Sequence, residues 1–432
     1  MSKRHIKLPT DLQSVFLRLE ELVLANSGED EFEEIFKLLV AKLFDEKKGG
    51  ERQFRFHSSE ETTFKEISKL LGGAEREWPG ILEDCLPKLT PNHLAVCVEA
   101  IAALELSGSG FEALDNFFEF LVAKQAKGAK GQYFTPRYVI EFCVRAIRPK
   151  INETVLDPAC GSGGFLFQTL NFIREEEKLA DGALKTYCDS NLWGFDIDPR
   201  AVRVAKALMV MAGDGRSNIL RLNSLLKPEI NGLFPINIGQ SGNEGPSLTV
   251  EDVCRTRMRN HKGFDVILTN PPFAGEVRER SFLDSYETGR GKAKVERDVL
   301  FIERCVELLK PGGRMAIILP HNKLSAGSCE PLRKWLLNEA RITSVVGLGR
   351  NTFLPHTHQK ASVVFAYKRL PNEKRRSDEK ILFAVSERDG KDSKGRLNIV
   401  SSEKAEKPLW TRVDHDLDSV LEELDKHLLT IK

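Results

Sequence analysis

Apolar residues in the first part of the chain recur with the spacing of one face of an α-helix. These positions are Phe32, Ile35, Phe36, Leu39, Val40 and Leu43. Glu33, Glu34 and Lys37 fall on the opposite face, and a second run of the same kind covers residues 111–122. The polar stretch 49–59 is predicted to be a loop. Residues 1–125 are therefore predicted to form an all-helical N-terminal domain.

From about residue 130 the pattern changes to short apolar runs that alternate with amphipathic stretches. The candidate strands are residues 154–156, 192–195, 219–222, 264–268, 315–319 and 342–348. Helical stretches are predicted between several of them, at 165–174, 200–212 and 300–310. This alternation is typical of an α/β domain with a doubly wound, mainly parallel sheet. We assign residues 126–372 to this domain and expect a further strand, 361–367, near the edge of the sheet.

Two insertions and a charged tail interrupt this order. Residues 227–262 are rich in Gly, Asn and Pro, and residues 274–295 carry many charges of both signs. Charged residues also dominate 371–402, which predicts a linker or exposed strands. The chain then ends on an apolar helical face near heptad spacing, which suits either a partner helix or docking on its own domain. Residues 373–432 are assigned to a C-terminal tail with a terminal helix.

Composition excludes several classes of protein. The chain has 432 residues, too many for one compact core, and 41% of them are hydrophobic. The net charge of +1 provides no global attraction for nucleic acid, so any such surface must be local. No apolar run approaches the ~18 residues that span a bilayer. None of the eight cysteines forms a Cys-x-x-Cys pair, so no metal site is expected, and their scatter suits a reducing cytoplasm.

A glycine-rich loop follows the first predicted strand. Asp157 stands at the end of that strand, where an open sheet places its ligands. Gly161, Gly163 and Gly164 allow a ligand to approach the backbone, and the next helix directs free N–H groups at an anion. The spacing does not match the Gly-x-Gly-x-x-Gly fingerprint of dinucleotide folds, and an acid precedes the glycines. This combination favours a ligand with an amino group, such as S-adenosylmethionine.

The next two strands end in further polar residues. Asp196 follows the second strand, where a carboxylate can accept both hydroxyl groups of a ribose. Asp198 is placed to cap the following helix, which begins at Pro199. Asn223, after the third strand, can bond the edge of an adenine, although a helix cap or a turn explains it equally well.

The segment Asn270-Pro271-Pro272-Phe273 follows the fourth strand. An aromatic amine is a poor nucleophile because its lone pair is delocalised into the ring, so its hydrogens need acceptors. The Asn270 side-chain oxygen and the Pro271 carbonyl can both accept, and Pro271 and Pro272 stiffen the backbone that carries them. Phe273 offers a flat face to an extruded base. This segment and the Asp157 loop together indicate group transfer to an exocyclic nitrogen.

A third motif precedes the sheet, in the segment Gly131-Gln132-Tyr133-Phe134-Thr135-Pro136-Arg137. With Phe-Thr-Pro, Asp-Pro-Ala-Cys-Gly-Ser-Gly and Asn-Pro-Pro-Phe in this order, the sequence resembles the methylation (M) subunits of type I restriction–modification systems. These are adenine-specific N6 DNA methyltransferases with the gamma order of motifs. The resemblance covers about residues 5–370. It implies a Rossmann-like methyltransferase sheet, mainly parallel with one antiparallel strand, behind an all-helical domain.

The resemblance also implies roles for individual residues. The residues expected to contact the cofactor S-adenosylmethionine are Gln132, Tyr133, Phe134, Thr135, Asp157, Gly161, Ser162, Gly163 and Asp196. Asn270 and Phe273 would act on the flipped adenine, and Phe353 would stack or wedge beside it. Asn223 stands where the family usually has an acid, so its place among the cofactor-binding residues rests on position alone.

The expected substrate is double-stranded DNA, read with the help of a specificity (S) subunit, because no base-recognition domain is evident. A restriction (R) subunit and a second copy of the chain are further candidate partners, and a cytoplasmic location is expected. The basic residues in 121–150 could form a phosphate-facing patch or a solvated helix face, and the sequence favours neither. Residues 274–295 are a candidate for a lid that orders on DNA. Two other reactions remain open: methylation of a protein glutamine, and of cytosine N4 in DNA.

Overall fold

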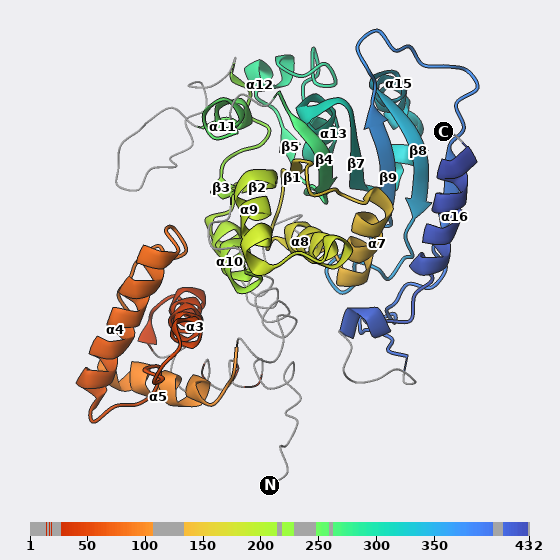
Figure 1. Ribbon diagram of the computed structural model, residues 1–432. Coiled ribbons are helices and arrows are strands. Elements are labelled where there is room, and N and C mark those ends of the chain that lie inside the picture. The colour runs from red at the N-terminus through yellow and green to blue at the C-terminus, as the bar shows by residue number, and fades with distance from the viewer. Residues whose placement is uncertain are drawn as a thin grey trace. The chain divides into compact units, whose positions relative to one another are not determined.

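The computed structural model describes residues 27–106, 134–213, 218–228, 248–258, 262–400 and 409–430, together with Ser14, Leu17 and Leu19. The chain forms two compact units, which are described separately. The first comprises Met1–Gly128 and Arg203–Arg216, and the second comprises Ala129–Val202 and Ser217–Lys432. Figure 1 shows the helices of the first unit in red and orange and the sheet of the second in yellow to blue.

The described part of the first unit contains helices whose starts are set by side-chain caps. They are α3 (Glu31–Lys48), α4 (Glu60–Glu77) and α5 (Pro91–Ala102). Each is preceded by a residue whose side-chain oxygen accepts a backbone N–H from three positions further on, a favoured way to satisfy the first turn. These caps are Asp30, Ser59 and Thr90. The stretch 49–59 between α3 and α4 contains no helix or strand, as the sequence predicts.

Helix α3 differs from its predicted amphipathic pattern because part of its polar face is also buried. Glu34 and Lys37 are 1% and 3% exposed and form an ion pair of 2.8 Å. The Lys37 ammonium also donates to the Leu86 carbonyl, and Glu34 accepts the backbone N–H groups of Lys88 and Leu89. Burial of both charges is tolerated because each has a partner of opposite sign and a backbone hydrogen bond.

The second unit is built on an eight-stranded sheet with the order β10-β8-β9-β7-β4-β1-β2-β3. Its strands are β1 (Val155–Asp157), β2 (Leu192–Asp196), β3 (Asn218–Arg221), β4 (Phe264–Thr269), β7 (Leu309–Pro320), β8 (Ala340–Gly347), β9 (Ala361–Lys368) and β10 (Leu382–Val385). Strand β9 runs antiparallel to both neighbours, and every other pairing is parallel. The predicted Rossmann-like sheet with one antiparallel strand is confirmed.

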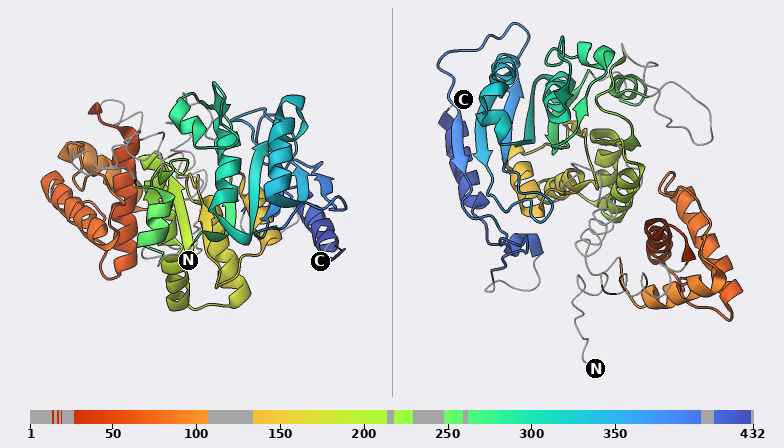
Figure 2. Two further views of the ribbon diagram at one scale, coloured as in Figure 1. Left: turned by 90° about the horizontal axis from the view of Figure 1, so that it is seen from above. Right: turned by 180° about the vertical axis from the view of Figure 1, so that it is seen from behind.

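Helices cover both faces of this sheet. The helices of the second unit are α7 (Arg137–Ile147), α8 (Gly164–Glu177), α9 (Asp181–Asn191), α11 (Val250–Thr256), α12 (Arg280–Asp284), α13 (Arg297–Leu308), α14 (Asn322–Ser325), α15 (Glu330–Glu339) and α16 (Leu417–Thr430). Helix α10 (Pro199–Met211) begins in this unit, and its residues from Arg203 belong to the first. Helices α7 and α8 pack together on one face, and α13 and α15 lie on the other (Figures 1 and 2). Two short 3₁₀ helices, η3 (Gly327–Cys329) and η4 (Leu409–Arg412), and a small β5 (Glu276–Val277) and β6 (Val295–Glu296) ribbon complete the unit.

The structure corrects one expectation for the last third of the chain and resolves another that was open. Strand β9 was expected near the edge, but it lies between β7 and β8, because β8 and then β10 add beyond it. Helix α16 packs against α7 and β10 and buries its apolar face, so it docks on its own domain. The buried residues of that face are Leu417, Val420, Leu421 and Leu424. Within the described residues, no helix has the length and apolar character to cross a membrane.

Candidate active site

The polar residues that the sequence analysis identified as candidates lie at the carboxyl ends of neighbouring strands of the sheet. Strands β1, β2 and β4 are adjacent and parallel, and they end at Asp157, Asp196 and Thr269. The strand order runs outward from β1 to β3 in one direction and from β4 to β7 in the other. The gap between β1 and β4 is therefore the topological switch point, where open α/β sheets bind their ligands. Asp157 and Asn270 stand on its two sides.

A short path of hydrogen bonds connects the three sequence motifs across this point. The Thr269 hydroxyl donates to Asp157 Oδ1 at 2.7 Å, which joins the end of β4 to the end of β1. The next residue, Asn270, donates from Nδ2 to Thr135 Oγ1 at 2.9 Å. Thr135 belongs to the Phe-Thr-Pro motif that precedes α7. The Asp157 loop, the Asn-Pro-Pro-Phe segment and the Phe-Thr-Pro motif are thus parts of one site.

The glycine-rich loop has the backbone shape that its sequence predicts. Gly161 and Gly163 adopt positive φ angles of 51° and 87°, a region that side chains disfavour. The Gly161 N–H donates to Asp196 Oδ2 at 2.9 Å, which ties the loop to the end of β2. No described atom lies within 4 Å of the position that a Cβ of Gly161 would take. The loop therefore presents bare backbone to open space beside a carboxylate.

Asp157 and Asp196 both contact this loop, and the pKa of each carboxyl group is raised. Asp157 is 2% exposed, and burial raises its pKa to about 7 although the Thr269 hydroxyl opposes that rise. Burial also raises the pKa of Asp196 to about 6, against the backbone N–H groups of Asp198 and Gly161. Titratable groups whose pKa values are shifted by burial, at the carboxyl ends of strands, are candidate functional residues.

Helix α7 places the Phe-Thr-Pro motif by packing closely on α8. A Cβ on Gly164, the first residue of α8, would lie 2.5 Å from Arg137 Nη1 and 2.7 Å from Ile140 Cδ1. A side chain at the start of α8 would therefore have to displace the ends of these two side chains, and α7 begins directly after Pro136. Phe134 meets the His356 ring at a centroid distance of 6.4 Å. Gln132 and Tyr133, also expected at the cofactor, lie outside the described residues.

The aromatic residue of the Asn-Pro-Pro-Phe segment faces a second aromatic ring. Phe273 and Phe353 are 6% and 1% exposed, and their rings meet edge to face at 5.6 Å. Phe353 belongs to the segment between β8 and β9, 80 positions further along the chain. The structure thus brings together the two aromatic residues that the sequence assigned to the target base. Pro271 and Pro272 lie between Asn270 and Phe273, in a stretch without regular secondary structure.

The remaining sequence candidates have local structural roles. Asn223 Oδ1 accepts the Leu225 N–H at 3.1 Å, which is the turn alternative considered for this residue. Its contact with a cofactor stays a prediction. Asp198 accepts the Arg200 N–H at 2.8 Å and caps α10, as expected. Ser162 is buried within the glycine-rich loop.

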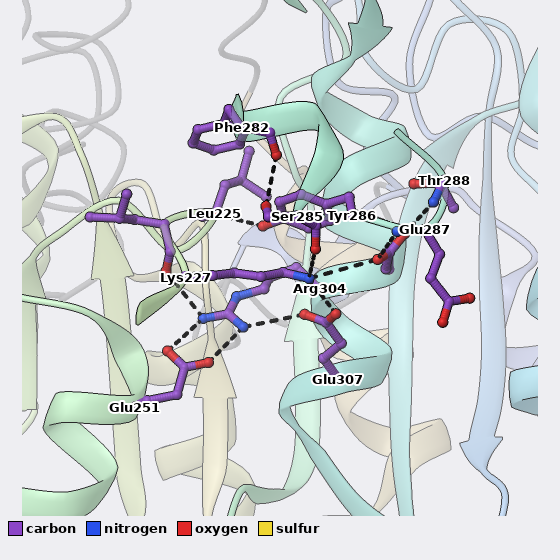
Figure 3. Close-up of polar contacts among 12 residues, drawn as sticks. Leu225, Lys227, Glu251, Phe282, Ser285, Tyr286, Glu287, Thr288, Arg304 and Glu307 are labelled. Carbon is purple, nitrogen blue, oxygen red and sulfur yellow. Dashed lines mark hydrogen bonds and ion pairs between the residues drawn. The ribbon is translucent and has the colours of Figure 1, made fainter. Parts of the chain in front are cut away.

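The insertion that follows Phe273 is folded and anchored by a buried polar network (Figure 3). Arg304 of α13 is 2% exposed and donates to both carboxylate oxygens of Glu251 and to the Ser224 carbonyl. Glu303 accepts the backbone N–H groups of Glu287 and Thr288 at 2.7 and 2.8 Å. Residues 274–295, expected to order on DNA, therefore already hold a defined structure against α13.

The basic stretch before the sheet is partly used inside the domain. Arg145 of α7 and Arg148, the residue directly after α7, pair with Asp418 and Asp425 of α16, at 2.5 and 2.7 Å. The side chains of Arg145 and Arg148 remain 42% and 61% exposed in these ion pairs, so the phosphate-facing patch stays a prediction. Lys124, Lys127 and Lys130 lie outside the described residues. Among the described residues, no group of three or more His, Cys, Asp or Glu could hold a metal ion.

Thr269 is the site residue that sequence reasoning missed. The sequence does place a hydroxyl at the end of β4. It indicates a contact with Asp157 only when β4 is known to lie beside β1, the strand that ends in Asp157. Tyr138 and Asp389 were missed as well, and no local pattern marks them. Their hydroxyl and carbonyl groups meet at 2.6 Å across 251 positions of sequence.

Comparison with known proteins agrees with the resemblance indicated by the three sequence motifs. A model of the N-6 DNA methylase family matches residues 111–421. The chain is 28% identical over 263 residues to the methylase subunit of the type I restriction enzyme EcoEI from Escherichia coli, an alignment that covers 60% of this chain and 47% of that protein. The chain thus spans about half the length of the curated relatives it matches.

Solved structures share the fold. A modification subunit from Vibrio vulnificus YJ016 superposes with a TM-score of 0.63 at 16% identity, covering 98% of this chain and 91% of that one. The type I restriction-modification system methyltransferase subunit from Streptococcus thermophilus gives 0.59 at 17% identity, covering 97% and 93%. The resemblance inferred from the three sequence motifs is confirmed, and the chain belongs to the N-6 DNA methylase family.

Proposed function

We propose that this chain transfers a methyl group from S-adenosylmethionine to N6 of an adenine flipped out of double-stranded DNA. The observation that carries the proposal is the path from Asp157 through Thr269 and Asn270 to Thr135, which joins three motifs at the switch point of the sheet. A cofactor loop and an amine-binding segment are thereby held within one connected site.

The residues around Asp157 fit S-adenosylmethionine. Asp157 accepts two hydrogen bonds through Oδ1, and its Oδ2 forms none with any described residue. A ligand that brings an ammonium and a sulfonium offsets the cost of ionising a buried carboxyl group. Asp196 is placed to accept ribose hydroxyls, and Gly161 and Gly163 leave room at the backbone. The donors and acceptors of this half therefore match both ends of the molecule.

The residues around Asn270 fit an aromatic amine. Because Nδ2 of Asn270 donates to Thr135, the amide is oriented, and its oxygen is directed away from that hydroxyl. The Asn270 oxygen and the Pro271 carbonyl accept the amine hydrogens and shift electron density onto nitrogen. S-adenosylmethionine, when bound at this site, would supply an electrophilic methyl group. The N–C bond would form as the S–C bond breaks, the sulfur would keep that electron pair, and one amine proton would be lost to water. Alignment and electrostatics carry most of the rate.

Phe273 and Phe353 support a planar base as the acceptor. Two edge-to-face rings at 5.6 Å form an apolar corner in which a flipped base can stack on one ring and contact the edge of the other. A glutamine side chain has no such need for two aromatic surfaces. This observation favours a nucleobase over a protein glutamine, while adenine is favoured over cytosine by membership of the N-6 family.

We further propose that the chain acts as the modification subunit of a type I restriction–modification complex in the cytoplasm. In that assembly a specificity subunit selects the DNA site, and a restriction subunit and a second copy of the chain complete it. The support is similarity to type I methylase subunits, whose length the chain spans only in part.

Sequencing of modified bases in the native genome, with and without this gene, tests the proposal. Loss of N6-methyladenine from one recognition motif, restored by the wild-type gene but not by Asn270→Ala, is the expected result. Loss of N4-methylcytosine would shift the substrate to cytosine. An unchanged methylome together with an undermethylated protein glutamine would replace the proposal with the protein-directed reaction.

A further inference from the structure

The loop that carries Phe353 contacts two of the sequence motifs. We define this Phe353 loop as residues 348–360, between β8 and β9. Phe353 meets Phe273 of the Asn-Pro-Pro-Phe segment at 5.6 Å, and His356 meets Phe134 of the Phe-Thr-Pro motif at 6.4 Å. The position of this loop therefore sets the shape of the corner proposed for the target base.

The end of the chain holds the Phe353 loop from behind. We define the C-terminal segment as residues 386–400 and 409–430. Asp389 Oδ2 accepts the Asn351 N–H at 3.1 Å, and the Lys391 ammonium donates to the Leu354 carbonyl at 2.8 Å. These bonds attach both sides of Phe353 to the C-terminal segment.

Glycines show how closely the two segments fit. A Cβ on Gly395 would lie 2.6 Å from the Pro355 nitrogen and 2.7 Å from the Leu354 carbonyl carbon. A Cβ on Gly349 would lie only 1.2 Å from Asp389 Oδ1, so any side chain there must displace the carboxylate. Backbone and carboxylate thus occupy space that only glycine leaves open on either side of the contact.

The same segment also holds α7, which begins directly after the Phe-Thr-Pro motif. The Tyr138 hydroxyl donates to the Asp389 carbonyl at 2.6 Å, and the Tyr138 ring stacks on His415 at 5.2 Å. Helix α16 then packs along α7 through its buried apolar face (Figure 1). Asp389 is therefore bonded through its carboxylate to the Phe353 loop and through its carbonyl to α7.

We propose that Asp389 is a positioning residue for methyl transfer, through which the C-terminal segment holds the Phe353 loop and α7 in register around the target base. This inference rests on the proposed function, and it gives a role to a segment whose charge pattern predicts a linker or exposed strands. Asp389 acts through Phe353 and Tyr138 and does not itself touch the base. Its loss should slow the reaction of bound substrate and leave cofactor binding unchanged.

Paired glycine substitutions give a matched test in the assembled complex. Gly349→Ala forces Asp389 away, whereas Gly347→Ala, two positions earlier, adds a Cβ whose nearest neighbour is Val385 Cγ2 at an ordinary 3.7 Å. Asp389→Ala removes the carboxylate and leaves the amino-acid sequence of the Phe353 loop unaltered, and Asp389→Asn keeps an acceptor for the Asn351 N–H. If Gly349→Ala does not fold, the two Asp389 variants carry the same comparison.

Two readouts are measured, kcat and KM on the DNA site identified by methylome sequencing, and hydrogen exchange of peptides within residues 348–360. Gly349→Ala and Asp389→Ala are expected to lower kcat roughly tenfold to a hundredfold with the KM for cofactor unchanged, since displacements of about 1 Å have such effects. They should also speed exchange of the Asn351 amide, while Gly347→Ala and Asp389→Asn stay close to wild type.

The outcomes separate this inference from the proposed function. If the wild-type complex methylates no adenine, the proposed function fails, and exchange at residues 348–360 still decides whether Asp389 holds the loop. If the wild-type complex is active but Gly349→Ala and Asp389→Ala match Gly347→Ala in kcat and in exchange, Asp389 has no positioning role and the inference is overturned.

Discussion

The two sides of the candidate site are assembled in different ways. Around Asp157, the side proposed for the cofactor, the contacts are short in sequence apart from the Thr269 bond that joins the two sides across 112 positions. Ala159 is two positions away, and Gly161 is bonded to Asp196 across 35 positions. Around Asn270 they are long, with Thr135 at 135 positions and, behind Phe353, Tyr138 bonded to Asp389 across 251. A local loop can be specified by one motif, whereas the second side depends on the packing of segments from the whole unit. Distant substitutions should therefore disturb the target side more than the cofactor side.

Asn270→Ala should give the largest effect and confine it to the target side. Removing a group aligned with the reacting centre lowers kcat roughly 100- to 1000-fold. The Kd for S-adenosylmethionine should change by less than about threefold, because the Asp157 loop is untouched. Single-turnover methylation and calorimetric titration measure the two quantities. A parallel loss of cofactor affinity would show that the two sides are not separable.

Thr269→Val tests the bond that joins the two sides. The variant leaves Asp157 Oδ1 without its 2.7 Å hydroxyl partner, which should lower the free energy of unfolding by about 1–3 kcal/mol and weaken cofactor binding. Chemical denaturation and cofactor titration provide the measurements.

Thr169→Val is the matched control for that change. Thr169 is fully buried in α8, and its hydroxyl has no hydrogen-bond partner in the part of the chain that the structure describes. Its loss should leave stability equal or slightly higher, because no hydrogen bond is broken. Equal destabilisation by both variants would mean that the Thr269–Asp157 bond contributes nothing beyond packing.

The pH dependence of cofactor binding should follow the titration of Asp157 on the cofactor side and not that of groups around Asn270. Because a cationic ligand prefers ionised carboxylates, affinity should rise about tenfold per pH unit below the Asp157 pKa of about 7 and level off above it. Asp157→Asn should flatten this profile. Titration between about pH 5 and 8 in buffers of different ionisation enthalpy detects the protons released, and a flat wild-type profile would contradict the assignment.

Stability of the ligand-free protein should change in the opposite sense. A carboxyl whose pKa is raised on folding, from 3.8 to about 7 for Asp157, binds its proton more tightly in the folded state. The stability it contributes is fully present below about pH 4 and is lost as pH rises through about 7. Asp196, whose pKa is raised to about 6, adds to the same trend.

Arg145→Ala should have the smallest effect. Its ion pair with Asp418 joins α7 to α16, but the two side chains are 42% and 65% exposed, so solvent screens them. We expect a change of about 0–1 kcal/mol in unfolding free energy and no change in kcat. A fall in kcat comparable to that of Asp389→Ala would mean that the surface pair, and not the buried contacts, positions α7.

The sequence predicted most of the fold because periodicity and strand-end motifs are local signals. Alternating apolar runs located β1 to β4, and the placement of Asp157, Asp196 and Asn270 at strand ends followed from the general behaviour of open sheets. The order of strands beyond β7 was not predicted, because pairing of β9 between β7 and β8 depends on contacts between whole strands. An apolar run alone does not distinguish a central strand from an edge strand.

The features that the sequence did not predict have one physical origin. The sequence does not distinguish Gly349 from other loop glycines. Only the structure shows that the Asp389 carboxylate occupies the position that a Cβ at residue 349 would take. Glu34 and Lys37 read as a solvated face until the backbone of residues 86–89 is placed over them. In each case the information lies in a contact between residues far apart in the chain, which composition and spacing do not record.

The most direct test of the central claim is the identity of the methylated product. The reconstituted complex is incubated with S-adenosylmethionine labelled in its methyl group and with DNA that contains the recognition site, and the digested nucleosides are separated by mass spectrometry. We expect label in N6-methyladenine with the wild-type chain and label formed roughly 100- to 1000-fold more slowly with Asn270→Ala. Label in N4-methylcytosine or in protein, or equal label in N6-methyladenine with Asn270→Ala, would contradict this claim.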